Sequence, residues 1–327
     1  MVSIPKDWAR AHDIDSGSEV AVFPGERSLV VEPMGGEDAV VEGAMDVSGL
    51  EGQHLRRAVI AMYVSGFDVI RFTADRFESG QRRDVREASQ HLAGLEVIEE
   101  TGTEIVFQDL LDSGEVSVER TVERMRLIAE DMFRDAVTAV LAGGDGMSED
   151  VIERDEDVDR MFAMITRLFR ASLRDFRSEE ELGISRTEAF DLHTAARQLE
   201  RIADHATKIA RVAQDVEEVP EGVRDDVASM RDDAIATVDD ALEALLELDG
   251  EDARARANTA LDAARDMDGR AREIDQDVQE LDAATAHLLG LVIDSVNRTA
   301  DYGGNIAETA LHAGTPAGVS VEADDGD

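Results

Sequence analysis

Two pairs of carboxylates with helical spacing are the residues of this chain best suited to chemistry. Glu200 and Asp204 are four positions apart, and so are Asp155 and Asp159. Residues with this spacing lie on one face of a helix, where like charges repel each other. Two such pairs on neighbouring antiparallel helices would form an oxygen-rich site for a hard or borderline cation. His205, next to Asp204, would add a nitrogen donor.

Acidic pairs of this kind also have an ordinary explanation. Acids make up 74 of the 327 residues, so pairs four apart arise often by chance. Arg201 could equally pair with a carboxylate of a neighbouring helix. The spacing alone therefore leaves open both a cation site and a solvated acidic surface.

The segment around Glu200 has a second copy near the C-terminus. Residues 199–210 read LERIADHATKIA, and residues 297–308 read NRTADYGGNIAE. Both copies place Asp three residues after Arg, and Ile-Ala five residues further on, which indicates a duplicated unit. In the second copy Asn297 replaces Glu200, so Asp301 remains as a lone candidate ligand.

The helix before the second copy also departs from the pattern. It offers Asp266, with Arg270 where a second acid would be needed. We therefore expect a full set of carboxylates only in the first unit.

The region that must position these pairs, residues 115–313, has an almost continuous helical pattern. Ser148 is an expected N-cap for its second helix, and Ser185 with Glu188 forms a capping box for its third. The expected helices are 118–141, 151–173, 186–212, 223–248, 253–278 and 281–312. The fold class expected is mainly α, with two tandem three-helix bundles, 115–216 and 220–313.

An apolar seam in the third helix separates core residues from candidate ligands. Leu199, Ile202, Ala206, Ile209 and Ala213 recur at spacings of three and four, as in coiled coils. The seam should face the core, which leaves the Glu200 pair beside it.

The first 112 residues differ from the helical region in their sequence pattern. Residues 1–35 form a small β element, with two strands joined by a turn at 24–27, and residues 36–112 form a small α/β domain. Its pattern predicts the order βαβαββ, with strands at 40–45, 67–72, 95–98 and 104–108 and helices at 55–64 and 81–92. Residues 314–327 read as an acidic, frayed tail.

Five arginines make the α/β domain the most basic part of the chain. They could meet phosphate or an acidic partner, or form salt bridges within the domain, and we favour the salt bridges. They are Arg56, Arg57, Arg82, Arg83 and Arg86.

The composition limits the class of protein. The formal net charge is −41, and Lys6 and Lys208 are the two lysines. Dense surface carboxylate with 43% hydrophobic residues predicts a folded protein adapted to molar salt, where charge repulsion is screened within about 3 Å.

Without cysteine, thiolate metal sites and disulfides are excluded. Since no signal peptide or apolar run of membrane length stands out, we expect a cytoplasmic protein.

The segment from Leu199 to Ala210 resembles the signature of the PhoU family, and residues 151–159, VIERDEDVD, resemble the preceding helix of the same repeat. The resemblance spans 115–313 and implies two tandem three-helix bundles. It also implies an iron or zinc cluster held by acid-x-x-x-Asp pairs. The residues implied as ligands are Asp155, Asp159, Glu200, Asp204 and, as a lone ligand, Asp301.

The N-terminal element resembles the AbrB/SpoVT DNA-binding domain. It has Ile4-Pro5-Lys6 entering a short helix, then Gly17 to Val20 and a hairpin. The resemblance implies DNA contacts by Ser3, Lys6 and Arg10. The strand that normally precedes Ser3 is missing, for which an upstream extension of the natural chain is one explanation.

Charge opposes DNA binding by this element. Residues 1–35 hold three basic against six acidic side chains, whereas affinity for DNA depends on positive charge at the phosphates. A small dimerising or docking element is the alternative.

No catalytic constellation stands out: the sequence has no Gly-rich phosphate loop, no GxSxG and no HExxH. We therefore expect a regulator and not an enzyme. The domain order resembles archaeal phosphate-uptake regulators, which implies contact with a phosphate ABC transporter ATPase or a sensor kinase, and a homodimer. The alternatives are an AbrB-type transcription factor that uses the helical repeats as a sensor, and a metal-binding helical scaffold.

Overall fold

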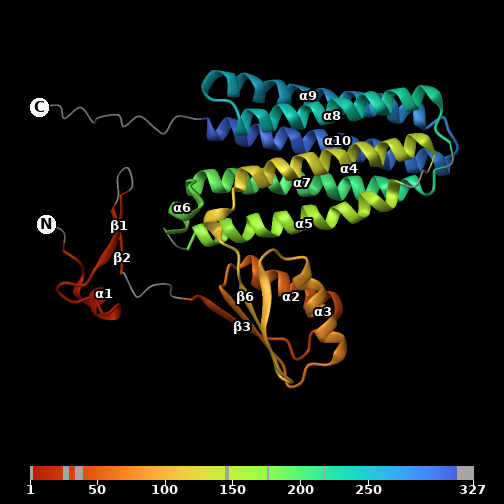
Figure 1. The fold of residues 1–327 in the computed structure, drawn as a ribbon. Helices are drawn as coiled ribbons and strands as arrows, with labels where there is room; N and C mark the ends of the chain where they lie inside the picture. Colours follow the sequence, from red (N-terminus) through yellow and green to blue (C-terminus); the bar gives the residue numbers. More distant parts are fainter. Residues whose placement is uncertain are drawn as a thin grey trace, which may run out of the picture.

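The computed structural model describes residues 3–24, 29–33, 40–143, 147–174, 177–216 and 218–314. Six long helices dominate this part of the chain and lie side by side in two layers (Figure 1). A small α/β domain packs below one of these layers. The expected class, mainly α with two three-helix bundles, is confirmed.

The first bundle consists of α4 (Val118–Ala142), α5 (Met147–Ser172) and α7 (Arg186–Ala213). The capping box that begins α7 is present, with the Ser185 hydroxyl accepting from the Glu188 backbone N–H at 3.1 Å. Ser148 was expected to cap α5 but lies inside it, because the helix already includes Met147. The short helix α6 (Arg177–Leu182) was not predicted, since six residues are too few for a periodic pattern.

The second bundle consists of α8 (Glu221–Leu246), α9 (Gly250–Val278) and α10 (Ala283–Ala313). Asp282 caps α10 by accepting from the backbone N–H groups of Ala284 and Thr285. These bounds lie within three residues of the predicted ones.

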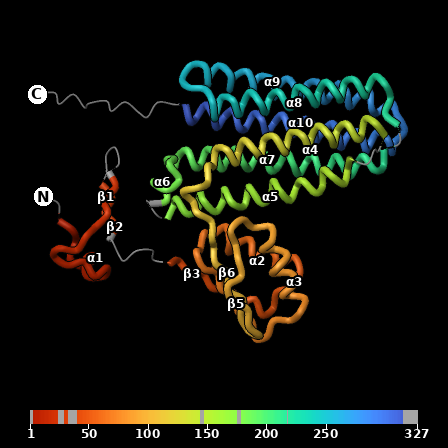
Figure 2. Tube along the Cα trace, in the orientation of Figure 1, coloured from red at the N-terminus to blue at the C-terminus, as the bar shows by residue number. Residues whose placement is uncertain are grey.

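The two bundles join where α7 of the first packs against α10 of the second (Figure 2). One continuous hydrophobic core runs through both bundles. Gly303 allows α10 to approach α8 closely, because a Cβ there would lie 3.1 Å from the Val238 nitrogen and 3.0 Å from Thr237 Cγ2. The two copies of the motif lie on α7 and α10, the helices that join the repeats, and Gly303 of the second copy packs within its own bundle.

The α/β domain has a four-stranded sheet in the order β3-β4-β6-β5. Strands β3 and β4 are parallel, and the other neighbours are antiparallel. Helices α2 and α3 cover one face, where Tyr63, Phe72 and Phe107 are fully buried. The bounds are β3 Glu42–Asp46, α2 Gly52–Val64, β4 Val69–Thr73, α3 Ser79–Gln90, β5 Leu95–Glu100 and β6 Glu104–Asp109. The predicted order βαβαββ is therefore present. A single 3₁₀ turn, η1 (Ser113–Glu115), leads into the first bundle.

The N-terminal element consists of α1 (Lys6–Ala11) and an antiparallel hairpin of β1 (Val20–Pro24) and β2 (Leu29–Pro33). Val22 pairs with Val31 across it. Of the predicted turn at 24–27, Pro24 ends β1 and residues 25–27 lie outside the described residues; of the predicted tail at 314–327, Gly314 follows α10 and the rest lies outside them.

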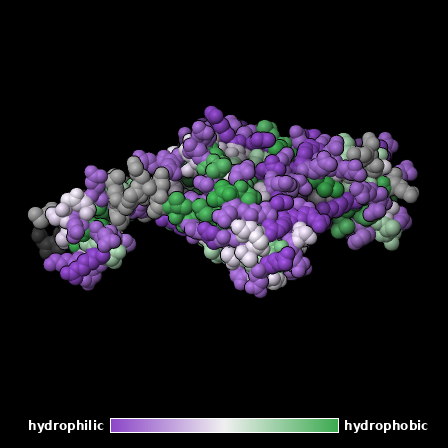
Figure 3. Space-filling view, turned by 60° about the horizontal axis from the view of Figure 1, so that its bottom comes forward, coloured by the Kyte–Doolittle hydropathy of each residue, from purple (hydrophilic) through white to green (hydrophobic). Residues whose placement is uncertain are grey.

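The described surface is largely hydrophilic on the face shown in Figure 3. Among the described residues, no helix is long and apolar enough to cross a membrane.

Candidate metal centre

Four carboxylates gather where α5 packs against α7. Asp155 and Asp159 lie about one turn apart on α5, and Glu200 and Asp204 do so on α7. The seam of α7 is buried, as predicted, which leaves the Glu200 pair at its margin. We call these four side chains the acidic face.

The members of the acidic face influence one another's ionisation. Burial, helped by the charges of Asp159 and Asp204, raises the pKa of Asp155 to about 6. Burial, helped by Glu200 and Asp204, also raises the pKa of Asp159 to about 6, although this residue borders a cavity. Each shift involves a charge on the other helix, so the two pairs act as one electrostatic unit.

Glu200 carries an unpaired, buried oxygen. Its side chain is 16% exposed, and its Oε1 lies 3.4 Å from Arg197 Nη1. Its Oε2 is buried and has no hydrogen-bond partner among the described residues. Burial raises the pKa of Glu200, the charge of Arg197 opposes that shift, and Asp204 adds to it. A cation would satisfy this oxygen, which is otherwise costly to bury.

The chemistry of this donor set fits a cation. Carboxylate oxygens are ligands for hard and borderline divalent ions. In the described part of the chain, however, no three acidic or histidine side chains stand close enough together to hold a metal ion. A bound ion would therefore have to draw these side chains together.

The region that builds the acidic face matches a known protein-family model. Residues 122–213, which include all four carboxylates, match the PhoU domain. We call the region of the chain that contains this match the PhoU domain. Residues 1–38 match the model of a second family, which is described as "Antidote-toxin recognition MazE, bacterial antitoxin". No curated protein matches the sequence.

Two solved structures share the fold of the PhoU region. One is PhoU from Pseudomonas aeruginosa, at 22% identity and a TM-score of 0.52 over 60% of this chain and 94% of that one. The other is the phosphate transport system regulatory protein PhoU from Streptococcus pneumoniae, at 15% identity and a TM-score of 0.50 over 62% and 96%. The resemblance to PhoU seen in the sequence is thereby confirmed.

Asp301, the lone candidate ligand of the second repeat, lies apart from the acidic face of the PhoU domain. Burial raises its pKa, and its charged neighbours are Arg298, Asp268 and Asp294. Arg298 Nη1 lies 3.3 Å from its Oδ2. The structure therefore does not bring Asp301 together with the four carboxylates.

Asp268 of α9, which the sequence analysis did not single out, contacts α10. Asn297 Nδ2 donates to Asp268 Oδ1 at 2.9 Å. Arg270 instead turns to α8, where it pairs with Asp233 and donates to the Ser229 hydroxyl at 3.1 Å. Asp266 is exposed on α9, and its role as a ligand stays a prediction.

His205 contacts the second repeat. Its Nε2 lies 3.2 Å from the Tyr302 hydroxyl, while its Nδ1 is buried and has no partner among the described residues. Burial lowers the pKa of His205, and Lys208 lowers it further. Arg201 lies over the Tyr302 ring, 5.7 Å from its centroid. The nitrogen donor expected beside the carboxylates is thus engaged between the repeats.

Arg167 of α5, which the sequence analysis overlooked, attaches the α/β domain to the PhoU domain. Its side chain is 5% exposed. It donates to the carbonyls of Tyr63 and Phe67, at 2.8 and 2.7 Å, and to Asp109 Oδ2 at 2.8 Å. Arg167 lies one turn after Ala163, whose side chain belongs to the core of the α/β domain, so it occupies the side of α5 that meets that domain.

The other predicted contact residues lie on the surface. Ser3, Lys6 and Arg10 are exposed, and Arg10 Nη1 lies 3.8 Å from Asp7 Oδ1.

In the α/β domain, Arg56 pairs with Asp84 and Glu87, and both Arg82 and Arg86 pair with Glu100. For these three arginines the interpretation as internal salt bridges is confirmed.

Proposed function

We propose that this protein regulates phosphate uptake and phosphate-responsive signalling. The observation that carries the proposal is the PhoU domain at 122–213 with its four-carboxylate acidic face. The similar protein from Streptococcus pneumoniae is described as a phosphate transport system regulatory protein. The likeness in fold supports the same class of function here.

The mode of action that we propose is protein–protein contact and not catalysis. The partner would be the ATPase of a phosphate ABC transporter or a sensor kinase, and the protein would act in the cytoplasm as a homodimer. The apolar side chains of the N-terminal hairpin support self-association, since Val22 and Leu29 are 49% and 52% exposed. Large exposed apolar residues in a small element favour burial against a second copy.

We also propose that the acidic face holds iron or zinc when loaded. Asp155, Asp159, Glu200 and Asp204 would supply carboxylate ligands, and the unpaired Oε2 of Glu200 supports this assignment. The ion would add positive charge to the surface that a partner meets. Asp301, with its own neighbours, would hold at most a separate ion.

Gene deletion tests the proposed function. In phosphate-rich medium the deletion strain should express the high-affinity phosphate transporter at a raised level, and the wild-type gene supplied in trans should restore repression. Unchanged transporter expression and uptake would count against phosphate regulation. If the purified protein still held metal in that case, the remaining interpretation would be a metal-binding helical scaffold.

The N-terminal element supports a second candidate, an AbrB-type transcriptional regulator with the PhoU region as its sensor. The observation in its favour is the match of residues 1–38 to the MazE antitoxin family, with the exposed Ser3, Lys6 and Arg10 as DNA contacts. Binding of the full chain to its own promoter DNA, by fluorescence anisotropy across a salt series, tests it. Affinity that falls steeply with salt and is lost in Lys6→Ala/Arg10→Ala would support DNA reading. Equal affinity of the variant would oppose it.

A further inference from the structure

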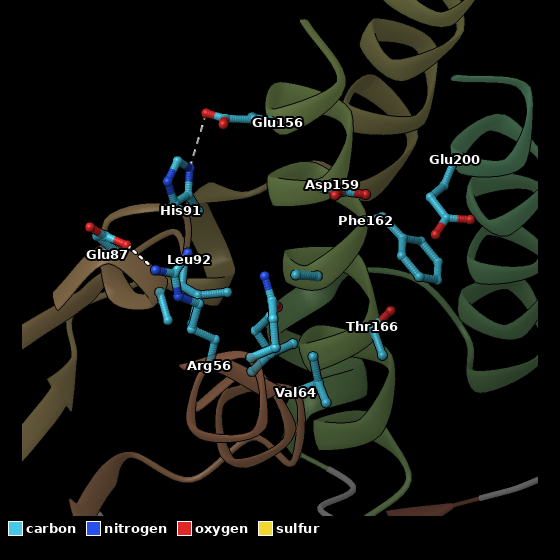
Figure 4. A pocket seen from close by; sticks show the side chains of 14 residues that line it. Arg56, Val64, Glu87, His91, Leu92, Glu156, Asp159, Phe162, Thr166 and Glu200 are labelled. Carbon is cyan, nitrogen blue, oxygen red and sulfur yellow. Dashed lines mark ion pairs between the residues drawn. The ribbon is translucent and has the colours of Figure 1, made fainter. Parts of the chain in front are cut away.

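A cavity of about 720 Å³ lies between the α/β domain and the PhoU domain. Helices α2 and α3 form one wall, and α5 with Glu200 of α7 forms the other (Figure 4). A volume of this size is in the range of sites for small organic molecules, roughly 300–1,000 Å³. The cavity is therefore large enough for a ligand that touches both domains.

Two contacts join the walls on either side of this cavity. Arg167 binds the carbonyls at the end of α2. On the other rim His91, the C-cap of α3, lies 3.4 Å from Glu156 of α5, measured from Nδ1 to Oε2, and forms an ion pair with it when protonated. The Arg167 contacts thus fix one end of the space between the walls.

The wall from the α/β domain is mainly apolar. Ile60, Val64 and Leu92 line it, and Phe162 and Ala163 of α5 continue the apolar lining on the opposite side. The one arginine in the lining, Arg56, is already paired with Asp84, at 3.0 Å, and with Glu87. This wall therefore offers an apolar surface and little free positive charge.

The wall from the PhoU domain carries two oxygen atoms that lack hydrogen-bond partners among the described residues. The Glu200 Oε2 and the Thr166 hydroxyl are both buried with no hydrogen-bond partner among the described residues. Asp159 adds a carboxylate to the same wall. Negative charge on this side would repel an anion and attract a positively charged hydrogen-bond donor.

We propose that this cavity binds an organic amine, with its ammonium group at Glu200, Asp159 and Thr166 and its apolar body against Ile60, Val64 and Leu92. The Glu200 and Thr166 oxygens that lack partners have almost no exposed surface, so both side chains must rotate toward the cavity before they accept hydrogen bonds from the ammonium group. The ring of Phe162, which already lies 5.2 Å from the Arg197 guanidinium, provides an aromatic neighbour suited to a cation. This binding does not depend on phosphate regulation, but the amine and a metal ion would compete for Asp159 and Glu200.

Two probes with the same alkyl body and opposite charge test the proposal. Hexylammonium and hexanoate are titrated calorimetrically into the full chain, in high-potassium buffer with a chelator that removes metal ions. Hexylammonium should bind saturably with one site per chain. Hexanoate should bind at least about tenfold more weakly, because hexanoate places its own carboxylate beside that of Glu200. Equal affinity for both probes, or no binding of hexylammonium, would overturn the proposal.

Variants locate the site. Ile60→Trp fills the cavity from a position that is 41% exposed, so it should fold and lose hexylammonium binding. Leu127→Trp is the matched control, because Leu127 is 52% exposed on α4 and does not line the cavity. Thr166→Val and Glu200→Gln should each weaken binding several-fold. Circular dichroism checks that each variant folds, and unchanged affinity in folded Ile60→Trp would contradict the assignment.

Discussion

His205 and Tyr302 occupy the same position in the two copies of the motif, and they contact each other. They are 97 residues apart, the spacing that also separates Arg201 from Arg298, and the His205 Nε2 lies 3.2 Å from the Tyr302 hydroxyl. Their ring centroids are 5.6 Å apart. A residue that touches its own counterpart lies on the axis that relates the two units. The duplication is therefore visible as an approximate two-fold contact between α7 and α10.

This contact should contribute to stability. Tyr302→Phe removes its hydrogen bond and should lower the free energy of unfolding by ~1 kcal/mol. His205→Phe should do the same, and the double variant should lose less than the sum of the two. Denaturant unfolding in concentrated potassium chloride measures all three, and strictly additive losses would show that the two side chains do not interact.

Arg167 should be the most costly single residue to replace at the domain contact. Arg167→Met removes the donors to Tyr63 and Phe67 and leaves Asp109 half-buried without its partner. Breaking such a buried pair typically costs ~3–5 kcal/mol. Limited proteolysis should then cut between the α/β domain and the PhoU domain. Arg170→Met, an exposed arginine on the same helix, is the control and should leave the digestion pattern unchanged.

Two glycines in the second bundle should respond to alanine in opposite directions. At Gly303 a Cβ would meet α8 backbone at 3.1 Å, so Gly303→Ala should destabilise by ~1 kcal/mol or more. At Gly269 nothing lies within 4 Å, so Gly269→Ala should stabilise by ~0.5–1 kcal/mol through helix propensity. Thermal melts compare the pair, and a stabilised Gly303→Ala would contradict the close approach of α10 to α8.

The acidic face should make stability depend on pH. The pKa values of Asp155 and Asp159 are raised in the folded state to about 6, so the folded state binds protons more tightly than the unfolded chain. The stability that these groups contribute should therefore be present at low pH and be lost as pH rises from about 4 through 6. Asp155→Asn/Asp159→Asn should remove that loss and melt higher than the wild type at pH 7.

Other groups titrate near this range, so the difference between variant and wild type is the quantity to measure. Burial, together with the neighbouring Asp239, raises the pKa of Glu130 to about 8. Burial lowers the pKa of His193 and His205, which opposes the effect of the acids on acidification. These contributions are shared by both proteins and cancel. A difference in melting temperature that stays constant from pH 4 to pH 7 would contradict the raised pKa values.

Metal content tests the acidic face directly. Protein purified from cells in high-potassium buffer should contain iron or zinc, and Glu200→Ala/Asp204→Ala should lose most of it. Asp262→Ala/Asp266→Ala is the matched control, since these exposed acids have the same four-residue spacing on α9. Equal metal content in all three proteins would rule out an ion on this face.

Much of the fold could be predicted because its signals are local. The capping box at Ser185 and Glu188 and the seam through Leu199 and Ile202 depend only on residues close in sequence, and both are present. The acid pairs of the first repeat followed from the same spacing rule. Asp268, which accepts from Asn297, was not singled out because spacing alone does not fix which acid of an acidic helix faces its neighbour.

What the sequence did not reveal depends on contacts between distant segments. Arg167 meets residues about 100 positions earlier, and Tyr302 meets His205 across the repeats. The cavity exists only where two domains pack together, so no single motif encodes it. Helix periodicity predicts the face that a residue occupies, whereas the partner on the other side follows from tertiary structure.

The central claim is that the acidic face of the PhoU domain carries the regulation of phosphate uptake. Phosphate uptake by the deletion strain in phosphate-rich medium tests it most directly, after complementation with wild type, with Glu200→Gln/Asp204→Asn or with the control Asp262→Asn/Asp266→Asn. Wild type and control should restore low uptake, and the acidic-face variant should leave uptake high although its protein is present at wild-type levels. Low uptake restored equally by all three would contradict the claim.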